Sequence, residues 1–159
     1  MKAYKIILVL LAICPLVSCS VTCRKAQPKN VNIRVTAYHA KESDHLKYKT
    51  LSACGKPLVK GKNIAADWSV FPVGTQLKFN NHIYEVSDYG SALVKPSNSI
   101  PTVDLYVANK REMNNWGVRF INNVEVISWG SYEKSLQILH DRLKYWHCRM
   151  MYDRIQAKL

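Results

Sequence analysis

Acidic residues are scarce in this sequence: 11 aspartates and glutamates stand against 23 lysines and arginines, a formal net charge of +12. An excess of this size favours polyanionic surroundings. For a cytosolic protein of this charge, nucleic acid is the first candidate partner. The N-terminal segment described below indicates export. We therefore expect no nucleic-acid partner, and instead anionic wall polymers, anionic lipid headgroups or lipopolysaccharide; the alternative is that the charge serves solubility alone.

Cysteine is sparse and scattered, and no two cysteines form a C-x-x-C pair. The five histidines show no metal-ligand spacing. We therefore expect neither a zinc nor an iron–sulfur site, and no cofactor. Beyond the N-terminal segment the cysteines are Cys23, Cys54 and Cys148. In an oxidising compartment they allow one disulfide and one free thiol, with Cys54–Cys148 one of the possible pairs.

No apolar run is long enough for a transmembrane helix, which needs roughly 20 residues. The run Ile6–Ile13 is short, follows Lys2 and Lys5, and is followed by small residues up to Cys19. A positive start, an apolar centre and a small-residue cleavage site predict a secretory signal over residues 1–19. An uncleaved N-terminal anchor is the alternative.

The end of this segment, Leu16–Cys19, resembles the lipobox of bacterial lipoproteins. The resemblance implies cleavage before Cys19 and acylation of its thiol; ordinary cleavage without a lipid is the alternative. The polar and basic residues 20–30 then form a tether. We therefore expect an exported envelope protein, anchored by lipid to a membrane that faces the periplasm or the outside.

The chain has 159 residues, which suits one domain after removal of the signal. Short alternating segments bounded by turn residues predict several strands. They are Val31–Tyr38, Ile64–Ala66, Thr75–Phe79, His82–Val86, Val103–Val107 and one bent or two short strands over residues 118–129. Asn80-Asn81 predicts a hairpin turn. Many short strands with close turns favour a mainly β fold, either a small barrel or a sandwich.

Three further segments complete the predicted organisation. Residues 39–62 are polar and lysine-rich, and indicate a long loop of the kind that is often functional. Asn109 can cap a short helix that ends at Trp116–Gly117. Residues 131–159 contain neither glycine nor proline and repeat apolar residues at helical spacing. They predict one C-terminal helix packed on the barrel, or alternatively a basic amphipathic helix lying on a membrane.

Three aspartates follow or interrupt apolar strand segments: Asp67, Asp88 and Asp104. An acid in an apolar strand costs stability unless it is paired or protonated. One such residue is usually a structural hydrogen-bond acceptor. Three of them among only 11 acids indicate a candidate active site.

A set of motifs surrounds these aspartates: Val35–Tyr38, Ile64–Asp67, Pro72–Thr75, Asp88–Ala92, Val103–Tyr106 and Trp116–Gly117. In this order they resemble the three-aspartate domain shared by membrane-bound lytic transglycosylase A and the small wall-lytic proteins of the stationary-phase and resuscitation type. The resemblance covers about residues 31–129. It implies a small double-psi β-barrel, for which we expect residues 31–130, with the three aspartates in a groove that holds peptidoglycan glycan strands.

Carried over by position, Asp104 matches the principal acid/base of the family, Asp88 opens its Asp-x-Gly-Gly-Ala stretch, and Asp67 is the first of the three aspartates. The implied substrate-binding residues are Thr36, Tyr38, Tyr89, Gly90 and Lys95. Two features depart from the pattern: Ser91 replaces the second glycine, and the segment from Asp88 to Asp104 is longer.

The implied activity is that of a peptidoglycan lytic transglycosylase, which cleaves the MurNAc–GlcNAc bond and leaves 1,6-anhydro-MurNAc ends. Such an enzyme needs one acid/base, so we expect Asp104 to titrate high beside the other carboxylates, with Asp88 holding or perturbing it. The two departures favour an alternative, a non-catalytic wall-binding lipoprotein on the same barrel. A structural lipoprotein that docks a partner is a third possibility. We expect a monomer in each case.

Overall fold

The computed structural model describes residues 27–41, 49–96 and 99–159. The predicted signal over residues 1–19, the lipid site at Cys19, Cys23 and most of the tether lie outside the described residues, so the expectations about them stay predictions. In the described ranges, none of the helices combines the length and apolar character that crossing a membrane requires.

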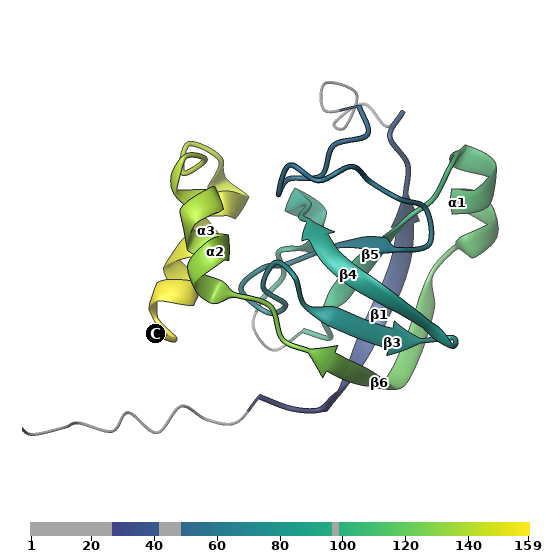
Figure 1. Ribbon diagram of the computed structural model, residues 1–159, viewed down its shortest axis with the longest axis horizontal. Coiled ribbons are helices and arrows are strands. Elements are labelled where there is room, and N and C mark those ends of the chain that lie inside the picture. Colours follow the sequence, from purple (N-terminus) through teal and green to yellow (C-terminus); the bar gives the residue numbers. More distant parts are fainter. Residues whose placement is uncertain (1–26, 42–48, 97–98) are drawn as a thin grey trace, which may run out of the picture.

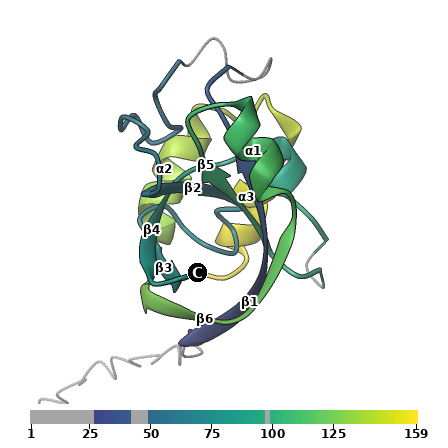
Figure 2. The same cartoon turned by 90° about the vertical axis from the view of Figure 1, so that its right-hand side faces the viewer.

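Six strands close into a barrel in the order β1-β5-β2-β4-β3-β6 (Figure 1). They are β1 (Asn30–Tyr38), β2 (Asn63–Ala66), β3 (Gln76–Phe79), β4 (His82–Asp88), β5 (Thr102–Tyr106) and β6 (Arg119–Ser128). The pairs β1–β5 and β2–β4 are parallel, and the other four are antiparallel. The predicted mainly β fold is thus confirmed as a closed, mixed barrel, seen end-on in Figure 2.

Local sequence chemistry accounts for the turns between these strands. Asn80 and Asn81 adopt positive φ values of 49° and 58° in the β3–β4 hairpin, as predicted, because asparagine tolerates this geometry. Residues 119–128 form one strand, with Asn123 at a φ of 56°. The side chain of Asn109 accepts a hydrogen bond from the Glu112 amide at 3.0 Å and caps α1 (Lys110–Trp116).

The barrel interior is filled by the alternate residues of its strands. Val35, Leu77, Val86 and Val103 are fully buried, one from each of four strands. Trp68 is also fully buried and its indole nitrogen donates to the Asp88 carbonyl at 2.8 Å. This core is what fixes the inner and outer faces of each strand.

The prediction of one continuous helix over residues 131–159 is wrong. The chain forms two helices, α2 (Tyr132–His140) and α3 (Trp146–Gln156), which lie beside the barrel (Figure 1). Arg142, in the turn between them, donates from Nη1 to the Tyr89 hydroxyl at 3.1 Å and from Nη2 to the Ala53 carbonyl at 2.9 Å. The turn is therefore fixed by contacts with the barrel, and no glycine or proline marks it in the sequence.

The predicted packing of this segment on the barrel is confirmed. Leu139 of α2 and Cys148, Met151 and Ile155 of α3 are fully buried and belong to the same apolar cluster as the barrel interior. Gly130 allows the close approach of the β6–α2 connection to Val73, because a Cβ atom at this position would lie 2.2 Å from the Val73 carbonyl oxygen. The apolar face of α3 is thus used by the core.

The pairing of Cys54 with Cys148 is not present: both are free thiols. The Cys148 side chain is enclosed in the core between α3 and the barrel, whereas Cys54 Sγ lies 3.4 Å from Ser52 Oγ in the loop before β2. The two cysteines therefore lie in different local environments.

Candidate functional site

A row of side chains crosses four adjacent strands on the face of the barrel wall opposite the core. Asp104 of β5 pairs with Thr36 of β1 and with Ala65 of β2, and Ala65 pairs on its other side with Asp88 of β4. Directly paired residues project to the same side of a sheet. Neighbouring strands lie about 4.8 Å apart, so the backbones at Asp88 and Asp104 are separated by about 10 Å. We call Thr36, Asp104, Ala65 and Asp88 the aspartate row.

Asp88 is held by three hydrogen-bond donors. Its Oδ2 accepts from the Tyr38 hydroxyl at 3.1 Å, and its Oδ1 accepts from the amides of Ala53 at 3.0 Å and Tyr89 at 2.9 Å. The residue is only 5% exposed. Because every one of these contacts uses Asp88 as an acceptor, the site suits an ionised carboxylate, which can only accept.

Tyr38 donates to Asp88 and lies within the electrostatic reach of Asp104. Burial raises the pKa of its hydroxyl well above the usual range, and the negative charge of Asp88, the hydrogen bond to Asp88 and the charge of Asp104 raise it further. The hydroxyl therefore stays protonated and acts as a donor. The ring packs against Tyr106 with 5.5 Å between centroids. Asp104 itself is half-buried in the middle of β5.

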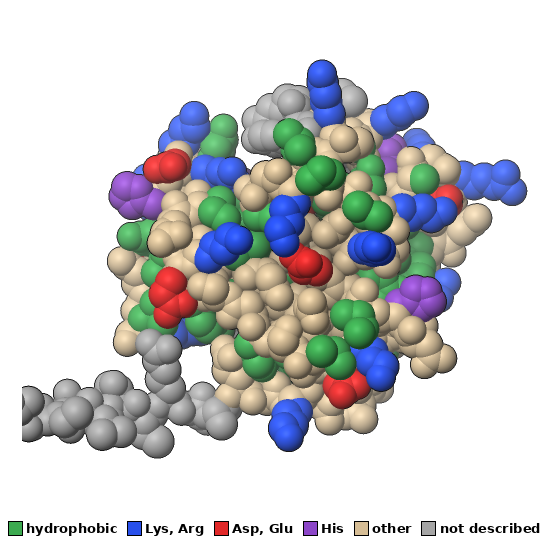
Figure 3. All heavy atoms as spheres, in the orientation of Figure 1, with side chains coloured by type: hydrophobic (Ala, Val, Ile, Leu, Met, Phe, Trp, Pro, Cys, Tyr) green, Lys and Arg blue, Asp and Glu red, His purple; other side chains and the backbone are tan. Residues whose placement is uncertain are grey.

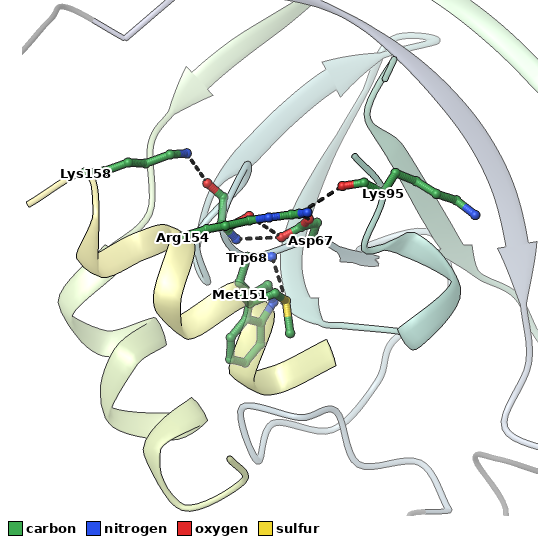
Figure 4. A network of polar contacts seen from close by, with 7 residues as sticks. Asp67, Trp68, Lys95, Met151, Arg154 and Lys158 are labelled. Carbon is green, nitrogen blue, oxygen red and sulfur yellow. Dashed lines mark hydrogen bonds and ion pairs between the residues drawn. The ribbon is translucent and has the colours of Figure 1, made fainter. Parts of the chain in front are cut away.

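Asp67 has a different set of contacts, shown in Figure 4. It lies just after β2, and its Oδ1 accepts from the Ser69 amide at 2.8 Å and from the Ser69 hydroxyl at 2.6 Å. Its Oδ2 forms an ion pair with Arg154 Nη1 of α3 at 3.2 Å. The same Nη1 donates to the Lys95 carbonyl at 2.9 Å. The C-terminal helix thus neutralises this carboxylate.

The predicted site residues therefore fall into two groups. Thr36, Tyr38, Asp88 and Asp104 are brought together around Ala65. Asp67 and the backbone of Lys95 belong to the Arg154 contacts, while the Lys95 side chain is exposed.

Tyr89 and Gly90 lie beside Asp88 as the sequence predicts, but Tyr89 is engaged by other parts of the protein. Its ring meets Trp68 edge-on at 5.0 Å between centroids, and its hydroxyl accepts from Arg142. Gly90 leads into the short 3₁₀ helix η2 (Ser91–Leu93), where the departing Ser91 is exposed.

Sequence reasoning did not identify Arg142 and Arg154, which reach the segments that carry Asp88 and Asp67. In a basic helix, lysines and arginines usually form the solvated face. One signal was available: Arg154 lies three residues after Met151 and four before Lys158, all on one side of a helix. That stripe places a cation at the edge of the apolar face.

The described residues contain no group of three or more His, Cys, Asp or Glu side chains placed to hold a metal ion. Lysine and arginine side chains are spread over the face shown in Figure 3, with few acidic ones between them. What the site offers is a pair of carboxylates in a basic surface. This combination suits acid–base chemistry on an anionic polymer.

No family model and no curated protein matches this chain. The geometry of the site and the order of its motifs are therefore the grounds for a functional assignment.

Proposed function

We propose that this protein is a peptidoglycan lytic transglycosylase built on a double-psi β-barrel. Its substrate is the glycan strand, and its products carry 1,6-anhydro-MurNAc ends. The observation that carries the proposal is the placement of Asp88 and Asp104 on either side of Ala65 in a closed six-stranded mixed barrel. The motif order that resembles the three-aspartate domain supports it.

The contacts of the two carboxylates suggest different roles. Asp88 accepts three hydrogen bonds and is suited to remain ionised. A second carboxylate close to a fixed negative charge holds its proton more tightly. Pairs whose environments differ in this way divide into an acid and a charged partner. Asp104 is then the acid/base, and Asp88 is the charged partner that perturbs it.

The reaction needs only this one acid/base. Asp104 gives its proton to the glycosidic oxygen as the bond to C1 of MurNAc breaks. The MurNAc 6-hydroxyl oxygen then forms a bond to C1, and Asp104 takes the hydroxyl proton. The enzyme regains its starting protonation state, and no water is consumed. This differs from ordinary glycosidases, which use two carboxylates and a water molecule.

The location in the cell fits the same proposal. An exported lipoprotein, acylated at Cys19 and joined to the barrel by residues 20–30, keeps a wall-cutting domain near its polymer. The excess of 12 positive charges favours an anionic wall.

One observation favours the second candidate, a non-catalytic wall-binding lipoprotein on the same barrel. Asp67, the first of the three aspartates in the resemblance, is ion-paired with Arg154 and is only 5% exposed. A carboxylate neutralised in this way is suited to support the fold. The replacement of a glycine by Ser91 next to Asp88 points in the same direction.

Digestion of purified wall sacculi separates the two candidates. The products are analysed by liquid chromatography and mass spectrometry for anhydromuropeptides. We expect them from the unaltered protein, and a loss of about 100-fold or more in Asp104→Asn, because general acid–base groups contribute on that scale. Asp141→Asn is the matched control, since that side chain is 86% exposed. Binding to sacculi without anhydro products supports the wall-binding module, and full activity in Asp104→Asn contradicts the assigned acid/base.

A further inference from the structure

A cavity of about 490 Å³ opens next to Asp67, between the barrel and the C-terminal end of α3. Its lining includes small and branched apolar residues, among them Val70, Leu93, Pro101 and Ala157. It also includes four charged residues: Asp67, Lys95, Arg154 and Lys158. The cavity therefore offers both apolar and charged contacts.

Positive charge exceeds negative charge in this lining, since three cationic residues and one acidic residue contribute to it. Burial lowers the pKa of Lys158; the charge of Asp67 opposes this effect, and the charge of Arg154 adds a smaller lowering. The excess of positive charge therefore rests on the count of residues that line the cavity, three cationic against one acidic. An anionic group bound in the cavity restores this balance.

The Arg154 and Lys158 side chains also have hydrogen-bond donors that are available to a ligand. Arg154 uses Nη1 for both Asp67 and the Lys95 carbonyl, and its Nε and Nη2 hydrogens have no acceptor among residues 27–41, 49–96 and 99–159. The Lys158 ammonium donates to the Ser69 carbonyl and has two further hydrogens. Figure 4 shows the Arg154 side chain extending from α3 to Asp67, and the Lys158 side chain, just after the end of α3, extending to the Ser69 carbonyl. A guanidinium edge beside an ammonium matches a carboxylate.

We propose that this cavity is a subsite for a carboxylate carried on a short apolar stem, such as the end of an alanyl peptide. The apolar side chains take the methyl groups, Arg154 and Lys158 take the carboxylate, and Lys95 adds positive charge to the lining. The assignment to a wall peptide rests on the proposed function, because Asp67 lies two residues after Ala65, so that a glycan on the aspartate row brings its attached peptide near the cavity. A free short peptide presents the same chemistry.

Binding of three probes tests the subsite: an N-acetylmuramyl dipeptide with a free carboxylate, its amide, and the dipeptide without the sugar. Affinities are measured on the purified protein by ligand-observed NMR at low salt. We expect the carboxylate probe to bind about tenfold more tightly than the amide, as expected for loss of a charge-assisted contact. Tighter binding of the muramyl form than of the bare dipeptide identifies the wall peptide as the source. Equal binding of these two identifies a free peptide.

Variants locate the binding to this cavity. Lys158→Gln and Lys95→Gln remove one charge each without leaving Asp67 unpaired, and both are expected to reduce the preference for the carboxylate about threefold to tenfold. Lys110→Gln on α1 makes the same charge change on the other side of the barrel (Figure 1) and is expected to leave the preference unchanged. Thermal unfolding verifies that each variant is folded.

Three results overturn the subsite: no binding of any probe, equal binding of acid and amide, or an equal loss in Lys110→Gln. Failure of the proposed enzyme is recognised separately. If the carboxylate preference holds while sacculi yield no anhydro products, the subsite stands and the transglycosylase assignment falls. If anhydro products form while acid and amide bind equally, the reverse is true.

Discussion

The ion pair between Asp67 and Arg154 gives the most direct test of how the C-terminal helices are joined to the barrel. The Asp67 side chain is 6% exposed and the Arg154 side chain 26% exposed. Exposed pairs contribute about 0.2–1 kcal/mol, whereas removal of one partner from a buried pair costs about 3–5 kcal/mol. This pair lies between the two limits, and we expect a coupling free energy of about 1.5 kcal/mol.

Arg154→Met keeps the apolar stem of the side chain and removes its charge. The variant loses the ion pair and also the hydrogen bond to the Lys95 carbonyl, which is worth about 1 kcal/mol. The free energy of unfolding is therefore expected to fall by about 2.5 kcal/mol, or about 10 °C in Tm at roughly 4 °C per kcal/mol. In an Asp67→Asn background the same substitution is expected to cost only about 1 kcal/mol.

The assay is urea unfolding of the four proteins of this double-mutant cycle, followed by circular dichroism. Arg111→Met, on an exposed position of α1, is the control and is expected to change stability by less than about 0.5 kcal/mol. If Arg154→Met costs the same in both backgrounds, Asp67 and Arg154 are not coupled in solution. The account of Asp67 as a carboxylate neutralised by α3 is then wrong.

Three other substitutions test separate features. Tyr38→Phe removes a hydrogen-bond donor from Asp88 and is expected to lower the free energy of unfolding in urea by about 1 kcal/mol. The same variant is expected to digest sacculi more slowly. If neither quantity changes, the Tyr38–Asp88 contact is contradicted. Gly130→Ala places a Cβ atom against the Val73 carbonyl and is expected to destabilise by about 1–3 kcal/mol, whereas Gly90→Ala, whose nearest contacts are at 3.5 Å, serves as the mild control. Burial lowers the pKa of His147, so the unfolded chain binds a proton more readily than the folded protein, and the free energy of unfolding is expected to fall as pH drops from 7 to 5. His147→Gln is expected to reduce the slope of unfolding free energy against pH. An unchanged slope refutes the assignment of this pH dependence to His147.

The two C-terminal helices matter to the candidate site because they contact the segments that follow its strands. Met151 Sδ accepts from the Trp68 amide at 3.3 Å, directly after Asp67. Arg142 reaches Tyr89, directly after Asp88, and Ala53, whose amide donates to Asp88. The helices therefore contribute to the surroundings of two aspartates, although the resemblance to the three-aspartate domain ends before them, at about residue 129.

Local chemistry predicted much of the barrel. The short alternating segments form the strands, since alternate residues fill the interior. Asn80 and Asn81 make the expected hairpin, and Asn109 makes the expected cap. These features were predictable because each depends on a few adjacent residues. The break between α2 and α3 was not, because it depends on contacts of Arg142 with residues 53 and 89.

Three aspartates at strand ends, in a basic chain with few other acids, were already recognisable as candidate site residues before any fold was known. The contacts that each aspartate makes depend on the three-dimensional packing. Strand pairing placed Asp88 and Asp104 on either side of Ala65, because closure of the barrel puts β2 between β4 and β5. Packing of α3 on the barrel pairs Asp67 with Arg154, which lies 87 residues further along the chain. No local pattern encodes that contact, because it depends on burying the face of α3 that carries Met151 and Ile155.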